Sequence, residues 1–118
     1  EFNNVTIIKE ATEGYEQAPA LIIQGHLDMV NEKTPDSPHD FEKDPLKLCI
    51  EGDWIHATGT TLGADDGIAV AYALALLEDK TISHPRLECI FTSDEEAGMD
   101  GAFICDACIV LQEKRKGK

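Results

Sequence analysis

The chain has 118 residues, of which 42% are hydrophobic, and its formal net charge is −13. This size and composition are typical of one folded domain and exclude a disordered chain or a pair of ordinary domains. Residues 1–113 carry 23 acidic against 6 basic side chains, a balance that disfavours binding to nucleic acid or anionic membranes. The sequence has no apolar run of membrane-spanning length and no signal-peptide pattern, so we expect a cytoplasmic protein.

Apolar, β-branched runs along the chain predict strands. The Gly-Asp pair in "EGDW", residues 51–54, predicts a hairpin turn that leads into "WIHAT". Residues 31–45 are polar and contain prolines, which indicates a long surface loop. The strand-like runs are residues 5–8, 20–23, 46–50, 87–92 and 107–111.

One strong helix is expected at residues 65–80, "DDGIAVAYALALLEDK". Its apolar surface is so wide that we expect the helix to be buried on most sides. Asp65 and Asp66 stand in its first turn, where carboxylates cap free amides and interact with the positive end of the helix dipole. A helix between strands with mixed connections indicates an α/β sandwich.

Three apolar elements each meet a cluster of polar side chains at one end. "GHLD" follows the second predicted strand, "GADDG" begins the helix, and "SDEEAG" follows the strand at 87–92. In an α/β sheet, the crevice beyond the carboxyl ends of the strands is where ligands bind. We therefore expect five side chains to converge there: His26, Asp28, Asp65, Glu95 and Glu96.

Each cluster also has an ordinary structural explanation. Asp65 and Asp66 alone are explained as helix caps, the "DEE" run as a solvated acidic turn, and His26 as a turn or core histidine. The repetition of one pattern at three elements favours a metal site instead. Zinc takes imidazole nitrogen and carboxylate oxygen, a metal pair can hold water and carbonyl together, and a neighbouring glutamate can act as general base.

Four segments, "QGHLDMV", "HDFEKDPLKL", "ATGTTLGADDGIAVA" and "DEEAGMDGAF", together resemble the aminoacyl-histidine dipeptidase (peptidase D, cytosol non-specific dipeptidase) family of di-zinc peptidases. The resemblance implies an α/β, zinc-peptidase-like catalytic domain with a mixed sheet and packed helices, truncated at both ends. Residues 1–118 are then part of that domain, and the lid or dimerisation domain is absent. The implied reaction is hydrolysis of dipeptides, of the Xaa-His type or a broad range, by a full-length parent that is a homodimer.

The resemblance also implies a role for each residue of the three clusters. His26, Asp65 and Glu96 match the metal ligands, and Asp65 matches the carboxylate that bridges two zinc ions, with cobalt or manganese as alternative metals. Asp28 matches the aspartate that orients the site, and Glu95 matches the general base. Two further family ligands have no evident counterpart, although Glu113 is an alternative for the acidic one. With two protein ligands for each metal where a catalytic zinc normally has three, we expect weak zinc binding and no activity of the chain alone.

Two other functions stay open at this point. The zinc-site motifs also suit an amidohydrolase that deacylates N-acyl amino acids, although the match around "HDFEKDPLKL" favours the dipeptidase. A non-catalytic acidic remnant that binds cations or a partner protein is the second alternative. A redox role for "CDAC", residues 105–108, has little support, because one CxxC without a thioredoxin-like pattern is a weak signal.

Overall fold

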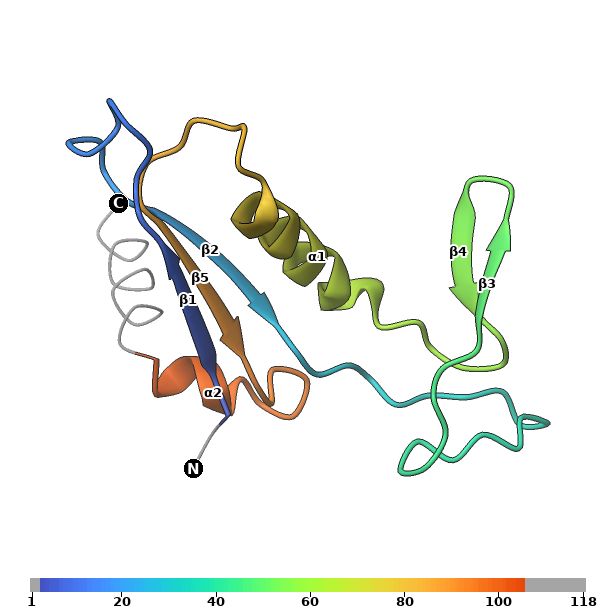
Figure 1. Ribbon diagram of the computed structural model, residues 1–118. Coiled ribbons are helices and arrows are strands. Elements are labelled where there is room, and N and C mark those ends of the chain that lie inside the picture. The colour runs from blue at the N-terminus through green and yellow to red at the C-terminus, as the bar shows by residue number, and fades with distance from the viewer. Residues whose placement is uncertain (1–2, 106–118) are drawn as a thin grey trace, which may run out of the picture.

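The computed structural model describes residues 3–105 (Figure 1). The helix and four of the predicted strands are confirmed, and the predicted strand at 107–111 lies outside the described residues together with Cys108 and Glu113. Antiparallel pairing of residues 51 and 54 confirms the hairpin turn. The elements in chain order are β1 (Val5–Lys9), β2 (Leu21–His26), β3 (Leu48–Glu51), β4 (Trp54–Ala57), α1 (Ala64–Glu78), β5 (Leu87–Thr92) and α2 (Asp100–Phe103).

The main sheet has three strands in the order β1-β5-β2. β1 runs antiparallel to β5, whereas β2 runs parallel to it. The central strand β5 is apolar along most of its length, and Cys89, Ile90 and Phe91 are all buried, as expected for a strand covered on both faces. The mixed sheet with a packed helix confirms the predicted α/β class.

Helix α1 packs against one face of this sheet (Figure 1). Ala73 of the helix meets Cys89 and Phe91 of β5 in the buried core. At the far end of the helix, the Lys9 ammonium donates to the carbonyl oxygen of Leu76 at 3.0 Å and to that of Asp79. A cation at the C-terminus of a helix satisfies free carbonyls and complements the negative end of the dipole, so β1 helps to fix the position of α1.

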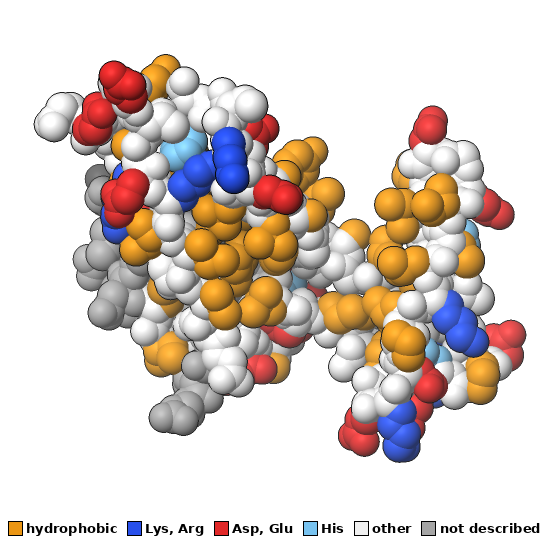
Figure 2. All heavy atoms as spheres, viewed as in Figure 1, with side chains coloured by type: hydrophobic (Ala, Val, Ile, Leu, Met, Phe, Trp, Pro, Cys, Tyr) orange, Lys and Arg blue, Asp and Glu red, His pale blue; other side chains and the backbone are white. Residues whose placement is uncertain are grey.

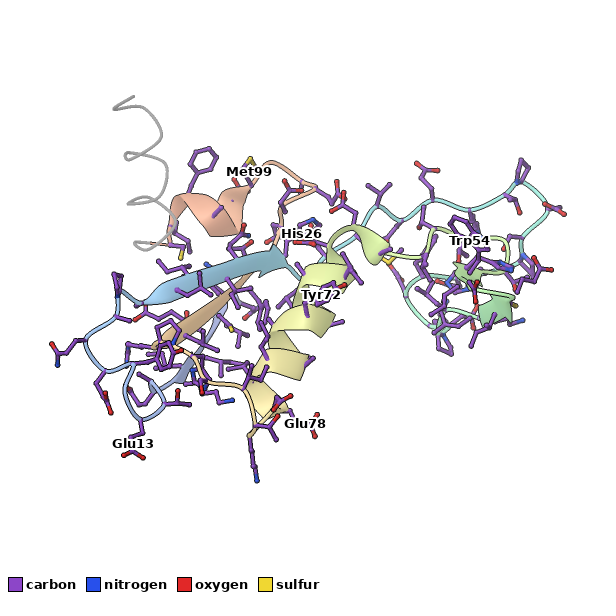
Figure 3. All side chains as sticks on the ribbon, turned by 90° about the horizontal axis from the view of Figure 1, so that it is seen from above. Glu13, His26, Trp54, Tyr72, Glu78 and Met99 are labelled. Carbon is purple, nitrogen blue, oxygen red and sulfur yellow. The ribbon has the colours of Figure 1, made fainter. Side chains whose placement is uncertain are left out.

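The expectation that α1 is buried on most sides is wrong for this structure. Ile68, Tyr72 and Leu74 are 57%, 66% and 49% exposed, and Figure 3 shows Tyr72 on the ribbon of α1. The reason is that the three-stranded sheet covers only one side of the helix. Hydrophobic side chains are correspondingly visible at the surface in Figure 2.

The β3–β4 hairpin lies apart from the main sheet, beyond the N-terminus of α1 (Figure 1). One segment connects it to β2 and another connects it to α1, and the two segments pair with each other. The Thr34 amide donates to the Gly59 carbonyl at 3.0 Å, and the Thr61 amide donates to the Glu32 carbonyl at 2.9 Å. The hairpin itself leaves Trp54 78% exposed. Among the described residues, no helix is both long and apolar enough to cross a membrane.

Gly25, near the end of β2, allows α1 to approach the sheet closely. A Cβ atom at this position would lie 2.9 Å from Asp66 Oδ2 and 3.1 Å from the Cβ of Ala69. Both distances are shorter than ordinary van der Waals contact. The glycine therefore determines how near the beginning of the helix can come to the end of β2.

Gly25→Val should push α1 away from β2 and lower the free energy of unfolding by about 1–3 kcal/mol, because overpacking a closely fitted contact strains its neighbours. Urea denaturation followed by circular dichroism measures the change. Gly67→Ala is the matched control: a Cβ there meets no atom within 4 Å, so the alanine should raise stability by about 0.5–1 kcal/mol. Equal stability of Gly25→Val and the wild type would contradict this explanation of the glycine.

Candidate metal centre

The parallel pairing of β2 and β5 brings two of the polar clusters together. Gly25 pairs with Phe91 and His26 with Thr92, so both strands end at the same edge of the sheet. The Leu27 amide then donates to the Thr92 carbonyl at 2.8 Å, which extends the pairing by one residue. The loops that carry Asp28 and the two glutamates begin directly beyond this point.

The ring of His26 is held in one orientation by the backbone. Its Nδ1 atom lies 2.9 Å from the carbonyl oxygen of Asp28, and because a carbonyl can only accept, Nδ1 is the nitrogen that carries the proton. In the neutral ring, Nε2 therefore presents its lone pair. A metal-binding histidine typically has its second ring nitrogen fixed in this way.

Asp28 connects the end of β2 to the loop after β5. Its Oδ1 accepts from the Glu95 amide at 3.1 Å, and its Oδ2 accepts from the Glu96 amide at 2.9 Å. One carboxylate thus holds the backbone of both glutamates. Since the same residue supplies the carbonyl that fixes His26, Asp28 positions three of the predicted site residues at once.

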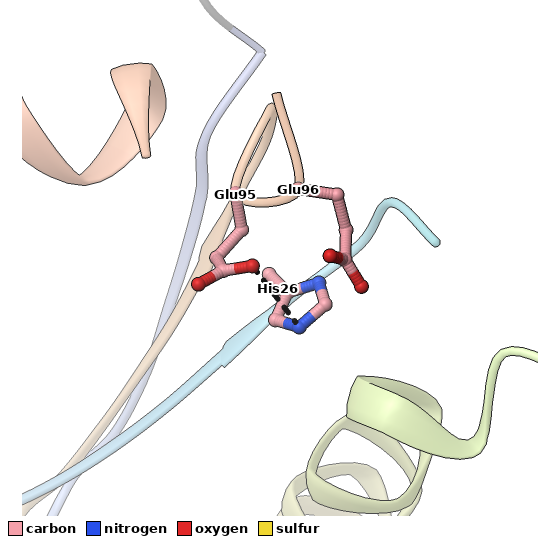
Figure 4. Close-up of side chains that lie close together, drawn as sticks. All are labelled: His26, Glu95 and Glu96. Atoms are coloured by element: carbon pink, nitrogen blue, oxygen red, sulfur yellow. Dashed lines mark ion pairs between the residues drawn. The ribbon is translucent and has the colours of Figure 1, made fainter. Parts of the chain in front are cut away.

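His26, Glu95 and Glu96 offer ligand atoms that all lie within 4.8 Å of one another. Figure 4 shows the two glutamates on either side of the histidine. The distance between His26 Nε2 and Glu95 Oε2 is 3.9 Å. The set is one imidazole nitrogen and two carboxylates, a donor set that suits zinc. The residues present therefore fit the cofactor that the resemblance implies.

The two aspartates at the beginning of α1 have different surroundings. Asp66 Oδ1 accepts from the Ala69 amide at 3.4 Å, which agrees with a capping role. Asp65 instead lies 3.2 Å from His26 Nε2 through its Oδ1, and its side chain is 90% exposed. Zinc binds such atoms at about 2.0–2.2 Å, so one ion can reach both His26 and Asp65.

The helix begins less regularly than its sequence predicts. Asp65 and Asp66 both have backbone angles outside the helical region, and Gly63 before them is left-handed with φ 75°. This irregular start turns the two neighbouring carboxylates in different directions. Asp65 lies outside the group of three formed by His26, Glu95 and Glu96, although it contacts the histidine.

The pKa of both His26 and Asp28 reflects this arrangement. Burial by itself lowers the pKa of His26, but the hydrogen bonds to the Asp28 carbonyl and Asp65, with the charges of Glu95 and Asp28, outweigh it and raise the pKa. Burial likewise opposes ionisation of Asp28, but the amides of Glu96 and Glu95 outweigh it and lower the pKa. The surrounding carboxylates therefore stabilise positive charge at His26. A metal ion bound at this position would be stabilised by the same carboxylates.

Asn4 was not predicted from the sequence, yet it fixes the loop that carries the glutamates. Its Oδ1 accepts from the Ser93 amide at 3.1 Å, and its Nδ2 donates to the Gly101 carbonyl at 2.7 Å. The residues it joins are far away in the sequence and share no motif with it. Only the pairing of β1 with β5 brings Asn4 to this edge.

Comparisons with known proteins agree with this geometry. Residues 22–116 match the sequence profile of the peptidase family M20/M25/M40. The cytosol non-specific dipeptidase of Escherichia coli K12 is 53% identical over 100 residues, which are 85% of this chain and 21% of that protein. The crystal structure of aminoacylhistidine dipeptidase from Vibrio alginolyticus aligns with a TM-score of 0.82 and 50% identity, over 86% of this chain and 21% of that one.

A third similar protein is the aminopeptidase PepT from Bacillus cereus, whose crystal structure aligns with a TM-score of 0.62 and 29% identity over 87% of this chain and 26% of that one. The family match covers most of the sequence, and the matched range includes His26, Glu95 and Glu96. The chain belongs to the peptidase family M20/M25/M40. It spans about a fifth of the length of the E. coli relative.

Asp28→Asn should loosen the loop that carries the glutamates, because the amide oxygen lacks the negative charge and the NH₂ group cannot accept a hydrogen bond. Hydrogen bonds to charged groups contribute about 1.5–3 kcal/mol, so exchange of the Glu95 and Glu96 amide protons should become at least about tenfold faster. Hydrogen exchange followed by NMR measures both amides. Asp94→Asn in the same loop is the control and should leave both rates unchanged. Unchanged rates in Asp28→Asn would contradict the positioning role.

Proposed function

We propose that this chain is part of the catalytic domain of a metal-dependent dipeptidase, and that residues 1–118 contribute its histidine and carboxylate cluster. One observation carries the proposal: in a member of this peptidase family, His26, Glu95 and Glu96 meet within 4.8 Å at the carboxyl ends of β2 and β5. The names of the E. coli and Vibrio relatives support dipeptides as the substrate class. The E. coli relative's name also supports a cytosolic protein.

We assign His26, Asp65 and Glu96 as the residues that would hold the metal, and Asp65, 3.2 Å from His26 Nε2, would act together with the histidine. The preferred metal is zinc, in agreement with the mixture of imidazole and carboxylate ligands. Bound zinc supplies Lewis acidity toward the scissile carbonyl and makes a water molecule more acidic. Xaa-His dipeptides and a broader range of dipeptides both belong to the proposed substrate class, and a homodimer is the proposed assembly of the full-length protein.

Glu95 is the proposed general base. Its side chain is 33% exposed, so it is reachable by water and yet attached to a backbone that Asp28 holds in place. A carboxylate in this position can take the proton of the attacking water and return it to the leaving amine. Asp28 acts through the residues it positions: it fixes the loop of Glu95 and the orientation of the His26 ring.

A chimera tests the proposal in a protein of the relative's full length. The segment of the E. coli dipeptidase that this chain matches is replaced by the present residues, and the hydrolysis of dipeptides is measured as the release of free amino acids. We expect zinc-dependent turnover, with a loss of about 10²–10⁴-fold in kcat for Glu95→Gln and unchanged zinc affinity measured by calorimetry. Asp94→Asn, one residue earlier, should keep its turnover.

Three outcomes would contradict parts of this account. An inactive chimera that folds and binds zinc would argue against the catalytic assignment. Loss of zinc affinity in Glu95→Gln would make Glu95 a ligand instead of the base, which its place in the group of three permits. Faster turnover of N-acyl amino acids than of dipeptides would favour the amidohydrolase.

A further inference from the structure

A small pocket lies beside the metal centre, on the side toward the β3–β4 hairpin. Its volume is about 290 Å³. Asp65 and Glu96 border it at one end, so the pocket is continuous with the candidate metal centre. Three apolar residues, Met29, Val30 and Leu62, also line it. The pocket thus has an acidic part at the cluster and an apolar end formed by these three residues.

The polar groups near the apolar end form hydrogen bonds with other groups in the wall of the pocket. The hydroxyl of Thr61 donates to the Val30 carbonyl at 2.6 Å, and the Thr61 amide donates to the Glu32 carbonyl at 2.9 Å. These bonds join the segment after β2 to the segment before α1. They leave the apolar side chains as the surface that a ligand would contact, and they hold that surface in place.

Gly63 allows one wall of the pocket to close. Its backbone has φ +75°, and a Cβ atom there would lie 2.7 Å from the Met29 sulfur. A residue with a side chain would therefore have to move the methionine as well as adopt a strained backbone. The glycine lets the segment before Asp65 lie directly against Met29.

We infer that this pocket is a subsite for one apolar side chain of the peptide substrate, next to the bond that is cleaved. The inference rests on the proposed function, because it takes the neighbouring cluster as the place of cleavage. The volume is at the lower end of the roughly 300–1,000 Å³ of small-molecule pockets, which suits one side chain rather than a larger ligand. An acidic side chain is disfavoured because it would lose its hydration beside Met29, Val30 and Leu62 without gaining a cationic partner there.

The test is binding of dipeptides to the 118-residue chain in the presence of zinc, followed by NMR of its amide resonances. Leu-Gly should bind about tenfold more tightly than Gly-Gly, since burying a few methyl and methylene groups in an apolar pocket contributes at least that factor. The shifted resonances should include those of Val30, Leu62 and Ala64, which border the pocket. Asp-Gly should bind no better than Gly-Gly.

Val30→Asp should abolish the preference for Leu-Gly over Gly-Gly, because it places a charge at the apolar end. Val30 is 45% exposed, so the fold should accept the change, and Val30→Thr provides a milder variant of the same shape, expected to reduce the preference. Ile82→Asp is the matched control: Ile82 is 41% exposed in the segment after α1, at the opposite end of the helix, and this variant should keep the preference.

Equal affinity for Leu-Gly and Gly-Gly would overturn the inference, as would a tenfold preference that survives in Val30→Asp. The same spectra report free leucine and glycine, so cleavage is followed separately from binding. If the pocket binds Leu-Gly selectively but the chimera described above has no turnover, the proposed function is wrong and the pocket is only a peptide-binding site. If both dipeptides are cleaved without selectivity, only the subsite inference is wrong.

Discussion

The parallel pairing of β2 with β5 is the constraint on which the candidate site depends. With Gly25 opposite Phe91 and His26 opposite Thr92, the two strands end together and their following loops begin side by side. A shift of the register by one residue would turn His26 to the other face of the sheet. Three features protect the register: the buried face of β5, the close approach of α1 at Gly25, and the hydrogen bond from Leu27 to Thr92.

Asp28 converts this strand arrangement into a site. It lies in the loop after β2, but its carboxylate accepts hydrogen bonds from the backbone of the loop after β5. A negatively charged side chain therefore joins the two loops. Hydrogen bonds to a charged group are shorter and stronger than neutral ones. The acidic side chains around His26 would repel one another without a cation, which explains physically why such a cluster suits a metal.

The sequence alone predicted the elements and which clusters of polar side chains lie close together, for identifiable reasons. Apolar, β-branched runs predicted β1, β2 and β5, and the polar residues after the strands predicted that His26 lies near Glu95 and Glu96. The resemblance distinguished Asp65 from Asp66, but the irregular helix start that gives the two residues different backbone angles was not predictable. Asn4 was not predictable either, since its partners are brought near only by strand pairing. The exposed side of α1, with Ile68 and Tyr72, was mispredicted because apolar periodicity does not reveal how much sheet is available to cover a helix.

The most direct test of the account is zinc titration by calorimetry on the 118-residue chain and two histidine variants. His26→Asn removes the imidazole at the centre of the cluster, and His56→Asn removes the histidine of β4, on the hairpin away from the sheet. We expect the wild type and His56→Asn to bind zinc alike, and His26→Asn to bind at least about tenfold more weakly, since even loss of an outer partner of a ligand costs 10–100-fold. Equal affinity of the two variants would show that zinc does not bind where β2 and β5 end, and would contradict the account.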